Sequence, residues 1–235
     1  MTITDQALER PETRAVALDL YRDIHKGIRA ELFAVTSLAG SIDPSDDAEI
    51  GALAGHVDSV VDLLFSHAAH EDEHIQPAIE QHLPDLAARI ASDHESLERR
   101  MTGLRALAPA VFDVPAAERR SMTHHCYLEI AGFTGVYLAH QDVEERLVMP
   151  GLEAAIGFDA VLAIHESIIA SIPPDEMSSS LAVMLPAMNV DDRAELLGGM
   201  RAGAPPEVFA GVWSLTGSLL PPSDHRSLAA RLELD

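Results

Sequence analysis

Two segments of the chain carry the same arrangement of histidine, carboxylates and proline. Residues 67–77 and residues 140–150 both follow the pattern H-x3-E-[D/E]-x4-P. On an α-helix, residues four positions apart lie on the same face, about 6 Å apart along the axis. The imidazole of each segment can therefore converge on one metal-binding region with its carboxylate, which is Glu71 in the first segment and Glu144 in the second.

Each segment follows a histidine that lies in an apolar helical stripe. His25 precedes His67 by 42 residues, and His94 precedes His140 by 46 residues. The similar separations indicate two copies of one helical hairpin, each supplying one histidine and then one His-x3-Glu pair. The predicted metal ligands are His25, His67, Glu71, His94, His140 and Glu144.

Four imidazoles and two carboxylates inside a helical bundle suit iron, manganese or zinc, and each carboxylate can bridge a pair of metals. Without a metal, burying these side chains would lower the stability of the fold by on the order of several kcal/mol unless their charges were paired. A single His-x3-Glu pair is usually a surface ion pair, and His25 or His94 alone would be an ordinary core histidine. The repetition over four helices is what favours a metal site.

Neighbouring histidines compete for the same region. His74 lies one turn beyond Glu71, so it is a candidate additional ligand, an outer hydrogen-bond donor or a polar residue at the bundle end. His70 and His74 also form a pair four residues apart in a shifted register. Only the register of His67 and Glu71, however, aligns Pro77 with the proline of the second segment.

Other residues near the predicted ligands have less specific patterns. Tyr21 and Tyr137 each either pack in the core or donate a hydrogen bond to a bound oxygen species. A His-His-Cys-x2-Glu group at residues 124–129 lies about 16 to 24 Å along the helix from His140, at a rise of 1.5 Å per residue. This group is too distant for the same centre, so its residues are either ordinary surface and packing residues or a second site at the other end of the bundle.

The elements that must position these residues are long helices. Apolar residues recur with helical periodicity, and aromatic residues are only 4% of the chain, too few for a typical β-sandwich core. Long helices with short links favour an all-α fold, an antiparallel up-down four-helix bundle. Pro77 is expected to kink or end the second helix, and residues 149–151 to end the fourth. The expected helices span residues 15–38, 48–81, 84–107 and 116–149.

The chain after the bundle has the pattern of shorter helices separated by pairs of prolines. The pair at 205–206 suits a helix start, and Asn189 and Ser223 are predicted N-caps. Apolar groups at 184–197 and 208–215 either pack against the bundle or present a groove to a protein partner, a second copy or a substrate. The predicted organisation is a flexible lead-in at residues 1–14, a four-helix bundle at 15–152 and a smaller C-terminal helical domain at 153–235.

The composition excludes several classes of function. Sixteen basic residues against 38 acidic ones give a net charge of −22, which argues against nucleic acid and anionic lipid as partners. Cys126 is the only cysteine, so an intramolecular disulfide is excluded and a reducing compartment fits. Because no signal peptide or membrane-spanning segment is apparent, the protein is predicted to be soluble and cytoplasmic.

The two His-x3-Glu segments, with the histidine before each, resemble the hemerythrin family, specifically the hemerythrin-like or HHE cation-binding domains. The resemblance covers roughly residues 15–152. It implies an up-down four-helix bundle that holds an oxygen-bridged pair of non-haem iron ions (Fe–O–Fe), with manganese or zinc as substitutes. It assigns one histidine each to the first and third helices and a His–Glu pair each to the second and fourth. Glu71 and Glu144 would be the bridging carboxylates.

Two departures separate this chain from the oxygen-carrying hemerythrins. Those proteins have a second histidine four residues after the third-helix ligand, where this chain has Glu98. They also carry an aspartate five residues after the fourth-helix histidine, whereas here Glu144 lies four residues after it. A ligand set with fewer histidines and more carboxylate resembles the family's sensing and peroxide- or oxygen-processing members.

Three hypotheses of function follow from the resemblance. The first is a di-iron protein that binds or reacts with O2, peroxide or another small molecule, as a carrier or as an oxidase, oxygenase or peroxide-decomposing enzyme. The second is a sensor whose C-terminal domain reports iron or oxygen occupancy to a partner. The third is an iron store, in which the negative charge attracts cations, although solubility alone explains that charge.

Overall fold

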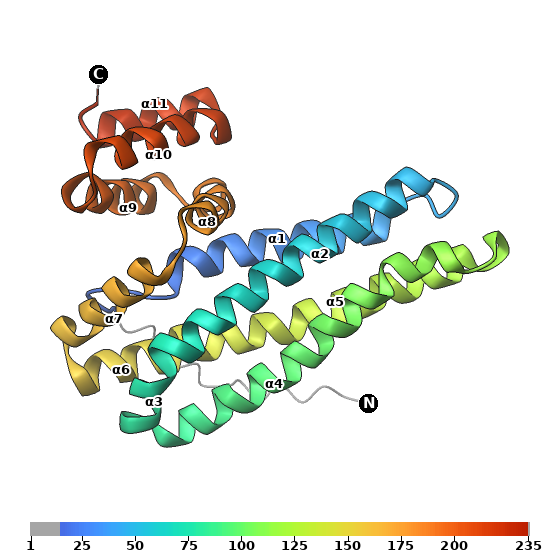
Figure 1. The fold of residues 1–235 in the computed structure, drawn as a ribbon, viewed down its shortest axis with the longest axis horizontal. Helices are drawn as coiled ribbons and strands as arrows, with labels where there is room; N and C mark the ends of the chain where they lie inside the picture. Colours follow the sequence, from blue (N-terminus) through green and yellow to red (C-terminus); the bar gives the residue numbers. More distant parts are fainter. Residues whose placement is uncertain (1–14, 235) are drawn as a thin grey trace, which may run out of the picture.

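Four long helices form a bundle in the computed structural model, which describes residues 15–234 (Figure 1). They are α1 (Arg22–Ser41), α2 (Asp47–His70), α4 (Pro84–Leu107) and α5 (Ala116–Val143). α1 packs against α2 and α5, and α4 packs against the same two helices. No β-strand occurs among the described residues, so the prediction of a helical chain is confirmed. The predicted lead-in at residues 1–14 lies outside the described part.

The observed helix ends follow local hydrogen bonding. α4 begins at Pro84 and ends at Leu107, as its periodicity predicts. α1 begins at Arg22 rather than near residue 15, because the carboxylate of Asp19 accepts hydrogen bonds from the backbone N–H groups of Tyr21 and Arg22. A 3-10 helix, Pro109–Asp113, joins α4 to α5.

The apolar stripes of the four helices build two cores, one on either side of a polar layer. The first fills the bundle towards its two interhelical turns and includes Leu32, Leu64 and Met101. The second lies at the opposite end and includes Ile75 and Val148. Each fully buried leucine or isoleucine contributes roughly 1.5–3 kcal/mol. On each long helix, the predicted metal ligands lie in the layer between the two cores.

α2 and α5 do not stop at their last α-helical residue. Each continues without a break through a π-helical turn and then a short α-helix. Both π turns begin at the glutamate of a His-x3-Glu pair. Such turns within α-helices are frequent at functional sites. The segments are Glu71–Ile75 and α3 (Gln76–His82) after α2, and Glu144–Val148 and α6 (Met149–Ile156) after α5.

The prediction that residues 149–151 end the fourth helix is wrong, because the helix continues through α6. Pro150 has no N–H group to donate, and in a regular α-helix its ring would clash with the carbonyl four residues earlier. In the π turn, the N–H of Met149 instead donates to the carbonyl of Glu144, five residues back. We infer that the wider turn accommodates Pro150. Pro77 follows the first π turn in the same way, and the second helix continues past it through α3.

Five helices follow the bundle. The second proline of each Pro-Pro pair starts one of them, at a position where its missing N–H group is not needed. Asn189 caps α9 as predicted, accepting hydrogen bonds from the backbone N–H groups two and three residues later. The predicted cap at Ser223 is wrong, because α11 already begins at Pro222 and the Ser223 hydroxyl donates to Asp224. The helices are α7 (Phe158–Ser171), α8 (Pro174–Ala187), α9 (Val190–Gly203), α10 (Pro206–Leu219) and α11 (Pro222–Arg231).

The last four helices enclose a core of their own. Leu197 and Val212, which come from the two apolar groups predicted after the bundle, both lie in this third core together with Leu228. α7 differs, because its buried residue Val161 belongs to the second core of the bundle. α8 packs against α1 and joins the third core to the bundle (Figure 1).

No described helix is by itself long and apolar enough to cross a membrane. One pair passes the test of length and composition together, namely the segments Ala116–Ile156 and Phe158–Ser171, which are bent by 117° relative to one another.

Candidate metal centre

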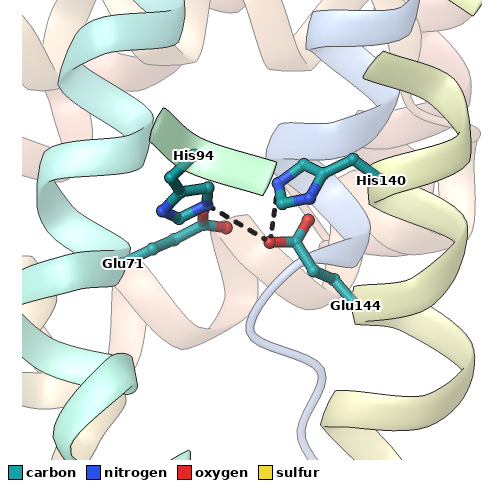
Figure 2. A group of neighbouring side chains, drawn as sticks. All are labelled: Glu71, His94, His140 and Glu144. Carbon is teal, nitrogen blue, oxygen red and sulfur yellow. Dashed lines mark ion pairs between the residues drawn. The ribbon is translucent and has the colours of Figure 1, made fainter. Parts of the chain in front are cut away.

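The six predicted ligands converge in the layer between the two bundle cores, and all six are buried. Their donor atoms form two overlapping groups in which every atom lies within 4.8 Å of the others. Figure 2 shows the larger group, with α2, α4 and α5 each directing side chains to the same point. The first group contains His25, His67 and Glu71; the second contains Glu71, His94, His140 and Glu144.

Each His-x3-Glu pair is closed by a short contact along its own helix. The Nε2 atom of His67 lies 3.0 Å from Oε1 of Glu71. The Nε2 atom of His140 lies 3.0 Å from Oε1 of Glu144. The i,i+4 spacing therefore produces the convergence that the sequence predicted.

Each glutamate also reaches the histidines of the other group through its second oxygen. Oε2 of Glu71 lies 3.3 Å from Nε2 of His94 on α4. Oε2 of Glu144 lies 3.5 Å from Nε2 of His25 on α1. Each carboxylate thus directs one oxygen to a histidine of the first hairpin and the other to a histidine of the second hairpin, which is the arrangement expected of a carboxylate that bridges two metals.

Four of the donor atoms at this centre lack ordinary hydrogen bonds. Both oxygens of Glu71, Oε2 of Glu144 and Nε2 of His94 are buried without a partner in hydrogen-bond geometry among the described residues, although histidine nitrogens lie within ion-pair distance. A buried polar atom left unpaired costs about 1–3 kcal/mol. A cation bound between imidazole nitrogens and carboxylate oxygens would satisfy these atoms, and iron, manganese and zinc all accept that donor set. The residues therefore fit a metal.

The histidines and carboxylates of the centre stabilise one another's charged forms. Burial would raise the pKa of Glu71 and Glu144, but the histidines around them lower it below the usual range. Burial would likewise lower the pKa of His25, yet hydrogen bonds to Glu145 and Glu71 raise it to about 9. The same opposition raises the pKa of His94 to about 12. At neutral pH, His25 and His94 therefore hold protons that a metal ion would displace.

A second layer of carboxylates holds the outer nitrogens of the histidines. Nδ1 of His94 donates to Asp72 at 2.8 Å, and Nδ1 of His25 donates to Glu145 at 3.0 Å. Arg29 in turn donates two hydrogen bonds to the carboxylate of Glu145, at 2.6 and 3.1 Å. Carboxylates in this position fix the ring orientation of a metal-binding histidine and increase its basicity.

These outer acids explain a part of the repeated motif to which the sequence assigned no role. Asp72 and Glu145 are the [D/E] residues that directly follow the two glutamates of the centre. Each binds a histidine of the other hairpin, so the motif couples the two hairpins crosswise. The repetition of an acid at this position was the available indication in the sequence. A third acid, Asp93, lies 3.7 Å from Nδ1 of His140.

The structure places the remaining candidates outside the two groups. Both ring nitrogens of His74 hydrogen-bond to α7, with distances of 3.0 Å to Ser167 and 3.1 Å to Ser171. Tyr21 and Tyr137 are buried beside the centre, with ring centroids 5.2 Å from His25 and 5.8 Å from His140, respectively. Burial raises the pKa of both tyrosines. Residues 124–129 do not join either group of donor atoms found in the described chain.

Comparison with known proteins gives one match. The family model of the hemerythrin HHE cation binding domain matches residues 16–152, which is more than half of the chain. Neither the search of the curated proteins nor the search of the solved structures found a match.

Proposed function

This chain belongs to the hemerythrin HHE cation-binding family, and from that membership we propose that it is a non-haem di-iron protein that reacts with O2 or peroxide. Its metal-binding domain would be an up-down four-helix bundle at residues 15–152, followed by a C-terminal helical domain. The family membership accounts for cation binding. The pair of iron ions and the reaction with oxygen species are the proposed refinements.

One observation supports a pair of metals rather than a single ion. Glu71 directs Oε1 towards His25 and His67 and Oε2 towards His94. Glu144 directs Oε2 towards His25 and Oε1 towards His140. In the proposed centre, each metal position is built from two histidines and shares both carboxylates. Manganese or zinc fits the same donors and is the alternative occupant.

The number of protein donors supports a reaction at the metals rather than simple iron storage. Two histidines and two shared carboxylates would leave a bound metal with room for a small molecule. A pair of iron ions, when bound, would supply the electrons with which O2 or peroxide is reduced. The chain's own part is to hold the histidines through Asp72 and Glu145 and to exclude water with the apolar cores on both sides.

Tyr21 and Tyr137 are the proposed hydrogen-bond donors to the bound molecule. Their rings lie against His25 and His140, and burial keeps their hydroxyls protonated at neutral pH, since it raises their pKa. A protonated hydroxyl at the edge of an apolar core can donate to an oxygen species but does not compete as a metal ligand.

Metal analysis combined with an optical spectrum tests the proposal. The purified protein is expected to contain two iron ions per chain and to change its spectrum when O2 or H2O2 is added to the anaerobic reduced form. A lasting band with O2 would indicate carriage, whereas rapid loss of peroxide would indicate catalysis. A native protein that takes up no metal would overturn the proposal, and the His67→Ala/His140→Ala double variant provides the metal-free control.

Sensing is a second candidate function, and one observation favours it. The C-terminal helices are docked beside the residues proposed to bind metal, on α1 and α2.

A further inference from the structure

Among the described residues, the polar contacts of the C-terminal helices with the bundle lie on the first hairpin. Residues 158–234 form hydrogen bonds and ion pairs with α1, with α2 and with the π turn after α2. These are the elements that carry His25, His67 and Glu71. The first half of the proposed metal centre is therefore covered by the C-terminal helices.

The contacts on α1 directly follow His25 in sequence. Lys26, the only lysine of the chain, forms an ion pair with Asp192 of α9. Gly27 lies under α8 so closely that a Cβ atom there would be 2.8 Å from Cγ1 and 3.2 Å from the backbone carbon of Val183. Backbone approach of this kind requires glycine on α1. α8 therefore packs directly on the turn of α1 that carries His25.

The contacts on α2 flank the other two residues of the same group. Ser66, next to His67, donates a hydrogen bond to Glu176 of α8. His70, next to Glu71, has its Nε2 atom 3.8 Å from the same carboxylate. Glu176 thus holds one turn of α2 from outside, on either side of His67.

The second half of the centre has no such cover. The residues next to His94 and His140 include Glu95 and Ala139, and both are exposed to solvent. No hydrogen bond or ion pair links them to α8–α11 within residues 15–234. The two histidine pairs are thus alike towards the metal and unlike towards the C-terminal helices.

We propose that metal binding by His25, His67 and Glu71 is thermodynamically coupled to docking of α8–α11 on α1 and α2. This inference rests on the proposed metal centre and names its regulation. Docking and metal binding both require the same arrangement of the α1 turn at residues 25–27 and of the α2 turn at residues 66–70. Because such coupling is reciprocal, metal would hold the C-terminal helices in place, and their release would weaken metal binding by the same factor. The second pair, His94 and His140, has no hydrogen bond or ion pair of its own with α8–α11 among the described residues, and would be linked to them only through Glu71 and Asp72, which contact His94.

Hydrogen exchange on the full-length protein tests the coupling. Amides of α8 are expected to exchange several-fold more slowly in the Fe2+-loaded anaerobic protein than in the metal-free protein. The factor is expected between about 5 and 150, the usual range for coupled sites. Equal exchange rates in a protein that binds two metals would overturn the inference. A protein that binds no metal would instead overturn the proposed function.

Gly27→Ala is the variant that separates α8 from α1 without removing a ligand. It is expected to weaken the tighter Fe2+-binding step about tenfold and to abolish the effect of metal on exchange in α8. Gly55→Ala, on α2, is the matched control, because a Cβ there meets nothing within 4 Å. Both variants gain the same helix propensity, so a difference between them reports the contact with Val183.

Asp192→Asn provides an independent test should Gly27→Ala fold poorly. It changes α9 alone and removes the charge that pairs with Lys26 and Arg22. A several-fold weaker first Fe2+-binding step would support the coupling. Unchanged affinity and unchanged exchange in both Asp192→Asn and a folded Gly27→Ala would overturn it.

Discussion

The two hairpins of the bundle present the same donors to the centre and different surroundings behind them. Behind His25, the carboxylate of Glu145 is neutralised by Arg29. Behind His94, no lysine or arginine is paired with Asp72 in the described structure, and the Asp72 side chain is 46% exposed. The difference teaches that a repeated motif can supply the same donor atoms from both hairpins while the residues behind those donors differ.

The same asymmetry is visible four residues after each of these two histidines. The position after His25 is Arg29, and the equivalent position after His94 is Glu98, which is exposed. At this one position the second hairpin therefore carries an acid where the first carries a base. Together with the cover over α1 and α2, this difference supports the proposal that the first hairpin is the half coupled to α8–α11.

The largest effects are expected where the two hairpins do not differ, at the shared carboxylates. Glu71→Gln and Glu144→Gln should each lower the metal content from two ions to one or none, because each removes a charged donor from both positions. The loss of affinity should exceed about a hundredfold, the upper figure for residues that only support ligands. Metal analysis after dialysis and anaerobic Fe2+ titration measure both quantities.

His82→Ala is the matched control for these variants, because His82 is an exposed histidine at the end of α3. It should retain two ions per chain. If Glu71→Gln and Glu144→Gln also retained two, neither glutamate would be a bridge. If only one of them lost metal, the centre would be less symmetric than the distances indicate.

The outer acids should show the difference between the hairpins directly. Glu145→Gln is expected to weaken metal binding more than Asp72→Asn, within the range of about 10- to 100-fold for such residues. Glu145 is the less exposed of the two, at 26% against 46%, and its loss leaves the charge of Arg29 unpaired beside His25. Stepwise Fe2+ titration of both variants measures the two affinities.

The double variant Arg29→Gln/Glu145→Gln controls for the unpaired charge. It should recover part of the affinity lost in Glu145→Gln, since it removes the cation together with its partner. Equal losses of metal affinity in Glu145→Gln and Asp72→Asn would mean that His25 and His94 are held equally firmly, and the two hairpins would then not differ in this respect.

The donors could be predicted from the sequence because their geometry is local. Residues four apart on one helix share a face whatever the rest of the fold does, and the repeat identified which pairs to choose. The outer acids were within the same motif, but their partners lie on the other hairpin, so only the folded chain reveals that Asp72 binds His94 and Glu145 binds His25. The close approach at Gly27 is non-local in the same sense, because it requires the position of α8.

The ends of the second and fourth helices were mispredicted for a different reason. A periodicity of 3.6 residues and a rule that proline ends a helix leave no place for a π turn. The prolines at positions 77 and 150 of the chain instead follow a widened turn, and both helices continue. The proline six residues after each glutamate was the feature of the sequence that indicated this turn.

The smallest effects are expected at these two prolines. The π turns should persist in Pro77→Ala and Pro150→Ala, because the buried side chains beyond them, such as Ile79 and Leu152, fix the helix register in the second core. Both variants should therefore keep two metals per chain. Pro150 is buried and Pro77 is exposed, so Pro150→Ala should lower the free energy of unfolding by about 1 kcal/mol and Pro77→Ala should change it by less than about 0.5 kcal/mol. Denaturant unfolding and metal analysis measure the two quantities, and loss of metal in Pro77→Ala would show that the proline itself, rather than the core, sets the position of Glu71.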